Sequence, residues 1–227
     1  MIDPNDFVIA RRRKKYKFAK FANSPLCFEL DEWQKTAADV VEVGAGTGLY
    51  SVELARRHPE SSFVAIDVKA DRLQKGAYAA EAAGLNNVRF LRARADQLAD
   101  CFTAGSVSTV WLTFADPFPK RRSSGRRMTH PTYLAIYGKL LKKDGSFIVK
   151  HDDPAFFSWS LEQLVEQGWH IVELSYDLHE SDAQDDYKIM TTYEARWKEQ
   201  GRLTHLVRAE PPRRTSRRSV SKARGEG

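Results

Sequence analysis

Short apolar runs alternate with helical segments along most of this chain, and this alternation narrows the folds open to it. Buried strands are predicted at residues 38–43, 62–67, 88–92, 107–114, 146–150 and 169–176, and the β-branched and aromatic residues of 189–197 favour a seventh strand. Helices are predicted at 49–57, 69–83, 132–141 and 156–167. Such alternation favours a doubly wound α/β sheet. No long helix separates the last two strands, so they should pair antiparallel.

A glycine-rich turn follows the first predicted strand and opens the first helix. It reads Glu42-Val-Gly44-Ala-Gly46-Thr-Gly48. Glycines at such a place let a ligand approach the backbone closely. The turn is not the dinucleotide fingerprint, because Leu49 stands where that pattern needs its third glycine. A turn of this kind also serves packing alone in many α/β proteins, so its meaning depends on the residues around it.

Four acids stand at or beside the ends of the first four strands: Glu42, Asp67, Asp96 and Asp116. Open α/β sheets bind ligands at the carboxyl ends of their strands. Four carboxylates there would repel a pyrophosphate, but they suit a ligand that carries an ammonium, a sulfonium and ribose hydroxyls. Each acid alone is more often a helix cap or a solvated turn residue than a ligand contact. The four together predict S-adenosylmethionine, with Asp67 on the ribose diol.

Basic residues are concentrated in three segments of a chain whose net charge is +6. Residues 11–20 carry seven cations and no acid, and residues 208–227 carry seven cations and two acids. The third segment follows Asp116 and contains Lys120, Arg121, Arg122, Arg126 and Arg127. The rest of the chain is acidic, so the three segments predict contacts with a phosphate backbone. Solvated loops and solubilising tails remain the alternative.

Three motifs make the chain resemble the bacterial tRNA (guanine-N7)-methyltransferases over roughly Asp6 to Arg208. The first is Asp116-Pro-Phe-Pro-Lys120 with the arginines behind it. The second is His151-Asp152-Asp153 followed by Phe157-Ser-Trp159-Ser160, and the third is Thr191-Thr-Tyr193-Glu194. The resemblance implies a class I methyltransferase with a Rossmann-like, seven-stranded, mostly parallel sheet and an antiparallel C-terminal strand. The resemblance covers the methyltransferase domain, expected over residues 23–208. Charge and composition, not the resemblance, predict a basic arm over residues 1–22 and a disordered basic tail over 209–227.

Carried over residue by residue, the resemblance assigns a role to each motif. The methyl donor, S-adenosylmethionine, would be held by Glu42, Gly44, Gly46, Asp67, Asp96 and Asp116. The guanosine would be contacted by Lys120, Asp152, Thr191, Tyr193 and Glu194, and tRNA phosphates by Arg121, Arg122, Arg126 and Arg127. The sequence departs from the family at Phe118, where tryptophan is usual, at Ser123 and Gly125 within the basic loop, and at His151.

The expected reaction is methyl transfer from S-adenosylmethionine to N7 of guanine 46 in the variable loop of tRNA. Asp116 is the expected catalytic residue: it would hold the guanine edge or fix the methionine end of the donor. Two alternatives stay open. One is a methyltransferase acting on a protein or a small molecule, and the other is a non-catalytic RNA-binding protein with a Rossmann-like body. A monomer or a homodimer is compatible with the sequence.

Several classes of protein are disfavoured by what the sequence lacks. No apolar run approaches the roughly 20 residues needed to span a bilayer. The N-terminal charges follow the apolar residues, the reverse of a signal peptide. Cys27 and Cys101 form no CxxC pair, and the six histidines show no metal-ligand spacing. We therefore expect a cytoplasmic protein with no membrane segment and no metal.

Overall fold

A single mixed sheet runs through the computed structural model, which describes residues 1–7 and 12–212, without the side chains of Arg12 and Arg13. Among these residues the sheet has eight strands in the order β1-β4-β3-β2-β5-β6-β8-β7. Their bounds are β1 Cys27–Glu29, β2 Val40–Val43, β3 Phe63–Asp67, β4 Val88–Arg92, β5 Val107–Thr113, β6 Leu141–His151, β7 His170–Ser175 and β8 His205–Glu210. Neighbours from β1 to β6 pair in parallel, and β8 runs antiparallel to β6 and β7. The doubly wound prediction is confirmed.

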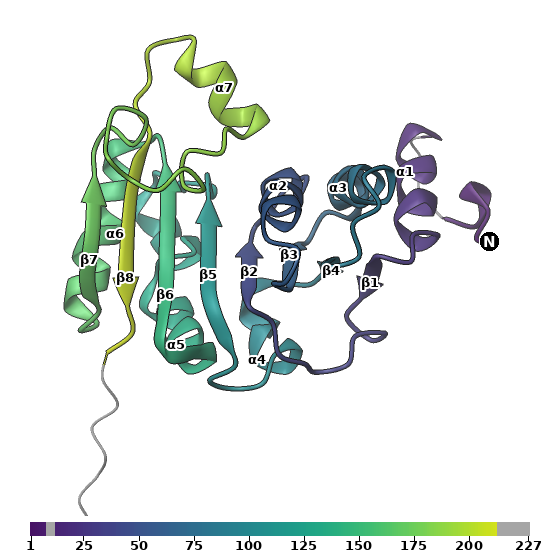
Figure 1. Ribbon diagram of the computed structural model, residues 1–227, viewed down its shortest axis with the longest axis horizontal. Coiled ribbons are helices and arrows are strands. Elements are labelled where there is room, and N and C mark those ends of the chain that lie inside the picture. The colour runs from purple at the N-terminus through teal and green to yellow at the C-terminus, as the bar shows by residue number, and fades with distance from the viewer. Residues whose placement is uncertain (8–11, 213–227) are drawn as a thin grey trace, which may run out of the picture.

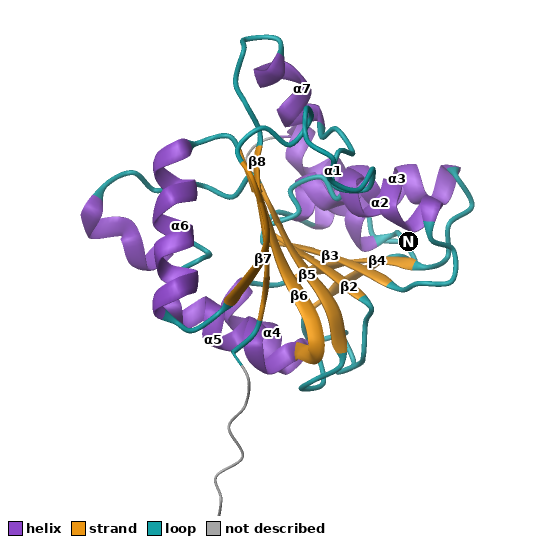
Figure 2. Ribbon diagram, turned by 60° about the vertical axis from the view of Figure 1, so that its left-hand side comes forward, coloured by secondary structure: helices purple, strands orange, loops and turns teal. Residues whose placement is uncertain are grey.

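Helices cover both faces of the sheet (Figures 1 and 2). Figure 2 shows α1, α2 and α3 on one face and α4, α5 and α6 on the other, while α7 stands beyond the upper edge. Their bounds are α1 Arg12–Ala22, α2 Leu49–Arg57, α3 Ala70–Ala82, α4 Leu98–Cys101, α5 Pro131–Leu140, α6 Pro154–Glu166 and α7 Thr192–Lys198. None of the helices in the described ranges is long and apolar enough to cross a membrane.

Alternation along the central strands builds two cores, one on each face of the sheet. Val64 and Ile66 of β3 join the core under α4–α6, whereas Phe63 and Ala65 join the core under α1–α3. Each such buried aliphatic or aromatic side chain contributes roughly 1.5–3 kcal/mol relative to an exposed one. Because both faces are buried, the strands read as continuous apolar runs, which is why their positions were predictable.

On the face that carries α2, no helix of the described residues lies over β6 and β8, and α2 reaches β5 through Tyr50 against Trp111. Residues 177–191, which we name the strap, cover β6 and β8 instead. Tyr187 and Ile189 of the strap are buried in the same core as Trp111 of β5 and Ile148 of β6. The ring centroids of Tyr187 and Trp111 are 5.3 Å apart. The strap is therefore an irregular segment that covers the sheet where a helix would otherwise pack. Its path is set by contacts with residues distant in the sequence.

The predicted seventh strand at residues 189–197 is wrong. Thr191 caps helix α7 there, in a capping box. The Glu194 amide donates to the Thr191 side chain, and the Glu194 side chain accepts the Thr191 amide. The antiparallel strand is β8, at residues 205–210. Strand propensity is a weak indicator compared with a completed capping box. The eighth strand is β1, whose three residues are too few to show a period.

The basic segment near the N-terminus folds into α1, which packs beside α3 (Figure 1). Phe21 and Ala19 are 2% and 4% exposed, whereas Lys14 and Lys20 are exposed. The boundary predicted at residue 22 therefore falls at the end of a packed helix. Residues 213–227 of the predicted tail lie outside the described residues.

Candidate active site

The glycine turn lies at the carboxyl end of β2, where the strand order reverses between β2 and β5. Gly46 has a φ of +58°, and a Cβ built there would meet no atom within 4 Å. Gly48 has a φ of +69°, but a Cβ there would lie 2.6 Å from Cε1 of Phe90. Gly48 is thus needed for packing, while Gly46 presents bare backbone to open space. A ligand can approach the turn at Gly46.

Asp67, at the end of β3, holds the glycine turn in place. Its carboxylate accepts the Gly46 amide at 2.9 Å and the Lys69 amide at 2.8 Å. Each oxygen keeps a lone pair for a further donor, because a carboxylate offers about four acceptor sites. Asp67 can therefore both fix the turn and accept hydroxyl groups of a ligand.

Glu42 is enclosed behind the turn at 1% exposure. One oxygen accepts the Ser51 hydroxyl at 2.6 Å, and the other accepts the Thr113 hydroxyl at 2.6 Å. Burial raises the pKa of Glu42 to about 6, although the bonds from Ser51 and Thr113 act in the opposite direction. Glu42 therefore ties β2 to α2 and β5 behind the glycine turn.

Asp96 and Asp116 complete the acids along this edge, and both are exposed. Asp96 is bonded to Arg94, whose Nε lies 2.9 Å from Oδ1, and this bond lowers the pKa of Asp96. Asp116 has no hydrogen bond or ion pair to any residue within 1–7 and 12–212. Of the four predicted acids, Asp116 is the one that makes no hydrogen bond or ion pair to a described residue.

Two strained aromatic residues flank Asp116. Phe114 has a φ of +48° and Phe118 a φ of +41°, in the left-handed region that such residues rarely adopt. Strain of this kind costs on the order of 1–3 kcal/mol and persists where the surrounding structure enforces it. The strained residues lie on either side of Asp116, and backbone strain of this kind is typical of active sites.

The loop beyond Asp116 carries its cations on a short 3₁₀ helix, Arg121–Arg126. Lys120, Arg121, Arg122 and Arg126 are exposed, and Arg127 is half-buried. The guanidinium carbon of Arg126 lies 4.4 Å from the ring centroid of Phe118. Four cations therefore project into solvent beside Asp116, as a polyanion-binding loop requires.

The end of β6 supports the Asp116 loop through His151. His151 is buried; its Nε2 lies 2.8 Å from the Ala115 carbonyl, and its Nδ1 accepts the Asp153 amide at 2.9 Å. Nε2 therefore carries the proton and donates to Ala115. Burial lowers the pKa of His151, which favours this neutral form. His151 thus positions the backbone directly before Asp116.

Asp152 and Tyr193, both predicted to contact guanosine, lie together. Burial, and then the neighbouring Asp152 carboxylate, raise the pKa of Tyr193. Asp152 is 7% exposed and also accepts Arg202 at 3.0 Å. Tyr193 is 46% exposed, and its ring centroid lies 5.2 Å from that of Phe114. The third motif is thereby brought against the Asp116 loop.

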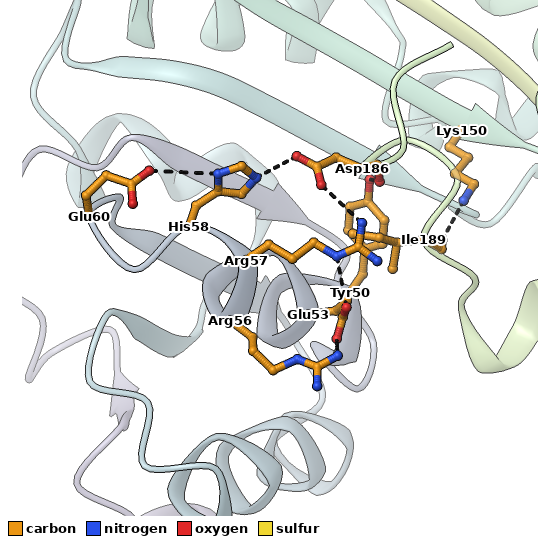
Figure 3. Close-up of polar contacts among 9 residues, drawn as sticks. All are labelled: Tyr50, Glu53, Arg56, Arg57, His58, Glu60, Lys150, Asp186 and Ile189. Carbon is orange, nitrogen blue, oxygen red and sulfur yellow. Dashed lines mark hydrogen bonds and ion pairs between the residues drawn. The ribbon is translucent and has the colours of Figure 1, made fainter. Parts of the chain in front are cut away.

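Glu194 is placed differently from the prediction, at the centre of a buried network. Its Oε2 lies 2.8 Å from Nζ of Lys150, and its Oε1 lies 2.7 Å from Nε2 of His179 and 3.1 Å from the Thr204 hydroxyl. Lys150 is 0% exposed and also donates to the Ile189 carbonyl at 2.8 Å (Figure 3). Burial lowers the pKa of Lys150, and Glu194 opposes this shift. With Thr191 as its helix cap, Glu194 orders the segment that displays Tyr193.

A second set of polar contacts fixes the strap to α2 (Figure 3). Asp186 lies 2.6 Å from Nε2 of His58 and 3.3 Å from Nη1 of Arg57, and its carbonyl accepts the Tyr50 hydroxyl at 3.1 Å. A cleft of about 560 Å³ lies between α2 and the strap, with Leu49 and Thr191 in its lining. The strap therefore connects the helix that follows the glycine turn to the third motif.

Sequence reasoning missed Lys150, Asp186 and Arg202. Lys150 did leave a signal, since a lone lysine inside an apolar strand must find a buried partner. Asp186 and Arg202 left none, because their partners lie 128 and 50 residues away. Within the described ranges, no group of three His, Cys, Asp or Glu residues could hold a metal ion.

The fold has counterparts among solved structures. The 16S rRNA methyltransferase KamB aligns with a TM-score of 0.59 at 19% identity, over 81% of this chain and 90% of that one. The 16S rRNA (adenine(1408)-N(1))-methyltransferase of Catenulisporales acidiphilia, solved with its cosubstrate SAM, aligns with a TM-score of 0.56 at 12% identity, over 95% of this chain and 94% of that one. At these identities the likeness concerns the fold alone.

Sequence relatives carry the assignment further. A family model described as a methyltransferase matches residues 36–206. The tRNA (guanine-N(7)-)-methyltransferase of Geobacillus kaustophilus is 36% identical over 78% of this chain and 81% of its own length. That of Brevibacillus brevis is 30% identical over 85% of this chain and 91% of its own. With the glycine turn, the acids and the three motifs gathered at one edge of the sheet, the chain belongs to the tRNA (guanine-N7)-methyltransferase family.

Proposed function

We propose that this protein transfers the methyl group of S-adenosylmethionine to N7 of a guanine in tRNA, at position 46 of the variable loop. One observation carries the proposal: Asp116 makes no hydrogen bond or ion pair to a described residue, follows β5, the neighbour of the strand that ends at the glycine turn, and directly precedes the exposed cations of its loop. The names of the sequence relatives support the same reaction.

The residues present fit the methyl donor. Gly46 offers open backbone, Asp67 has lone pairs for ribose hydroxyls, and Gly44 lies in the same turn with a φ of +70°. Asp96 is exposed at the neighbouring strand end and would line the adenosine side. Glu42 acts from behind, by holding the turn. When bound, the donor supplies an electrophilic methyl group on a sulfonium.

Asp116 would act on the acceptor through electrostatics and orientation. Guanine N7 carries a lone pair at neutral pH, so the reaction needs no strong base. Alignment of N7 with the methyl group can supply roughly 7–11 kcal/mol of the barrier in favourable cases. Because methylation at N7 makes the base cationic, a carboxylate beside it also stabilises the charge that develops. Asp116 is thus proposed to hold the guanine edge rather than to attack the donor.

The guanosine would be received between the Asp116 loop and the third motif. Tyr193 and Phe118 offer aromatic surface, and stacking on such side chains is common in RNA recognition. Asp152 and Lys120 offer an acceptor and a donor at this place. Thr191 and Glu194 contribute by fixing the start of α7. A guanine in folded tRNA must leave its stack to enter, as bases do in other base-modifying enzymes.

The tRNA backbone would be bound by cations in two places. Arg121, Arg122 and Arg126 lie on the exposed loop, and Lys14 and Lys20 are exposed on α1. Contacts of this type position the RNA without reading its sequence. Such an enzyme would act in the cytoplasm, as a monomer or a homodimer.

Transfer of labelled methyl groups to transcribed tRNA tests the proposal. Label should enter wild-type tRNA and be released on depurination as 7-methylguanine, and tRNA with position 46 changed from G to A should stay unlabelled. Label that persists in the altered tRNA would refute the target. Donor binding without any labelled RNA, together with labelled protein or small molecules, would favour a methyltransferase of another class.

A further inference from the structure

Arg127 differs from the other cations of the Asp116 loop because its guanidinium turns inward. Nε lies 3.1 Å from the Pro117 carbonyl and 3.3 Å from the Phe118 carbonyl, and Nη2 lies 3.2 Å from the Phe118 carbonyl. Its central carbon lies 4.5 Å from the ring centroid of Trp159 on α6. This guanidinium is stacked on an indole and bonded to two carbonyls. Few of the N–H donors with which an arginine binds phosphate are therefore left for a ligand.

The two residues after Arg127 are fixed as well. A Cβ built on Gly44 would lie 3.4 Å from the sulfur of Met128, so Met128 lies against the donor turn. The Thr129 hydroxyl is 2.8 Å from that of Ser160, and both residues are 0% exposed. Residues 127–129 are therefore held between α6 on one side and the glycine turn on the other.

The carbonyls that Arg127 holds belong to the two residues after Asp116. Phe118, with its φ of +41°, is the strained one. A strained backbone persists only where its surroundings enforce it. The bonds from Arg127 close the loop back on itself at this point, and the stack on Trp159 ties the closed loop to α6.

We propose that Arg127 is a positioning residue that clasps the Asp116 loop onto Trp159, and that it is not a phosphate contact. We call this contact of Arg127 with Trp159 and the two carbonyls the clasp. Through residues 127–129, it fixes the position of Asp116 relative to the donor turn. It also gives a part to two residues of the second motif, because Trp159 contacts Arg127 and Ser160 is bonded to Thr129. The inference rests on the proposed function, since it names a residue that orients the acceptor side of the same site.

Three variants of the full-length protein separate a clasp from a phosphate contact, with steady-state methylation of tRNA and tRNA binding at several salt concentrations as the readouts. Arg127→Gln should lower kcat about 10- to 100-fold, as expected for a reacting group displaced by about 1 Å. Its tRNA Kd and its salt slope should match those of the wild type. Arg127→Lys should be equally impaired in kcat, because an ammonium keeps the charge but cannot stack and bridge two carbonyls. Arg122→Gln, from the exposed part of the loop, should instead raise KM and lower the salt slope by about 1.

Trp159 provides the matching test on the other side of the clasp. Trp159→Leu should reproduce the kcat defect, Trp159→Phe should largely retain kcat, and Arg127→Gln combined with Trp159→Leu should be little worse than either alone. Restoration of kcat in Arg127→Lys, or a reduced salt slope in Arg127→Gln, would overturn the clasp. Donor binding and thermal unfolding show whether each variant folds; should Arg127→Gln not fold, Arg127→Lys and Trp159→Leu decide. Absence of tRNA methylation by the wild type would refute the proposed function and not the clasp.

Discussion

The two halves of the site are built in different ways. On the donor half, Gly46, Asp67 and Asp96 reach the site from the ends of neighbouring parallel strands, so the sheet places them. On the half proposed for the acceptor, Asp152 and Tyr193 are placed by side-chain contacts between residues distant in the sequence, such as the pair of Lys150 with Glu194 and the pair of Arg202 with Asp152. The hydrophobic pattern that predicts strands therefore also locates the donor half. The acceptor half depends on buried ion pairs and hydrogen bonds, which that pattern does not predict. Four predictions test this contrast.

The largest effect is expected from Glu194→Ala, because it leaves Lys150 buried without its carboxylate. Breaking one partner of a buried ion pair costs about 3–5 kcal/mol, so the free energy of unfolding in urea should fall by that amount. Glu162→Ala, at an exposed position of α6, should stay within about 0.5 kcal/mol of the wild type. If the Glu194→Ala protein has normal stability but fails to bind tRNA, Glu194 contacts the substrate and the structural role is wrong.

Asp116→Ala should follow, with a fall in kcat on the order of 10²–10³, the range seen when one preorganised electrostatic group is removed. Stability should be unchanged, because Asp116 is exposed and bonds to no described residue. Single-turnover methylation measures the chemical step. Asp144→Ala, an exposed aspartate in β6, serves as the control. Near-normal single-turnover rates in Asp116→Ala would contradict the catalytic role.

Glu42 predicts a dependence of stability on pH in the donor half. Burial raises its pKa from 4.5 to about 6, so the folded state binds a proton more tightly than the unfolded chain does. Stability from this group is therefore highest at low pH and falls by about 2 kcal/mol as the pH rises through the window from 4.5 to 6. Urea unfolding of the wild type and Glu42→Gln across this window should show the difference between them changing by that amount. A constant difference would mean that Glu42 titrates normally.

The smallest effect is expected from Arg121→Gln on the exposed loop. Loss of one phosphate contact should weaken tRNA binding moderately and lower the slope of log K against log salt by about 1. Lys143→Gln, at an exposed position of β6, should leave the slope unchanged. Equal slopes for both variants would place the RNA away from the Asp116 loop.

The local patterns of the sequence determined the sheet and the donor half of the site. Strands buried on both faces must be continuously apolar, and the loops at their carboxyl ends must meet at one edge, so the glycine turn, Asp67 and Asp116 could be placed from the sequence. The motif that contains Thr191 and Glu194 was recognised, but its aromatic and β-branched residues were taken for a strand. The capping box between those two residues decided for a helix.

Only the tertiary structure decided which of the predicted residues face a ligand. Glu42 and Glu194 are buried, Arg127 turns inward onto Trp159, and Asp116 alone among the four predicted acids makes no hydrogen bond or ion pair to a described residue. The physical reason is that residue type fixes what a side chain can do, whereas its burial and partners fix what it does. Glu42, a buried carboxylate with two hydroxyl donors, and Asp116, a carboxylate in solvent, both appear in the sequence only as acidic residues. The packing around them makes Glu42 a structural support and leaves Asp116 open to a ligand.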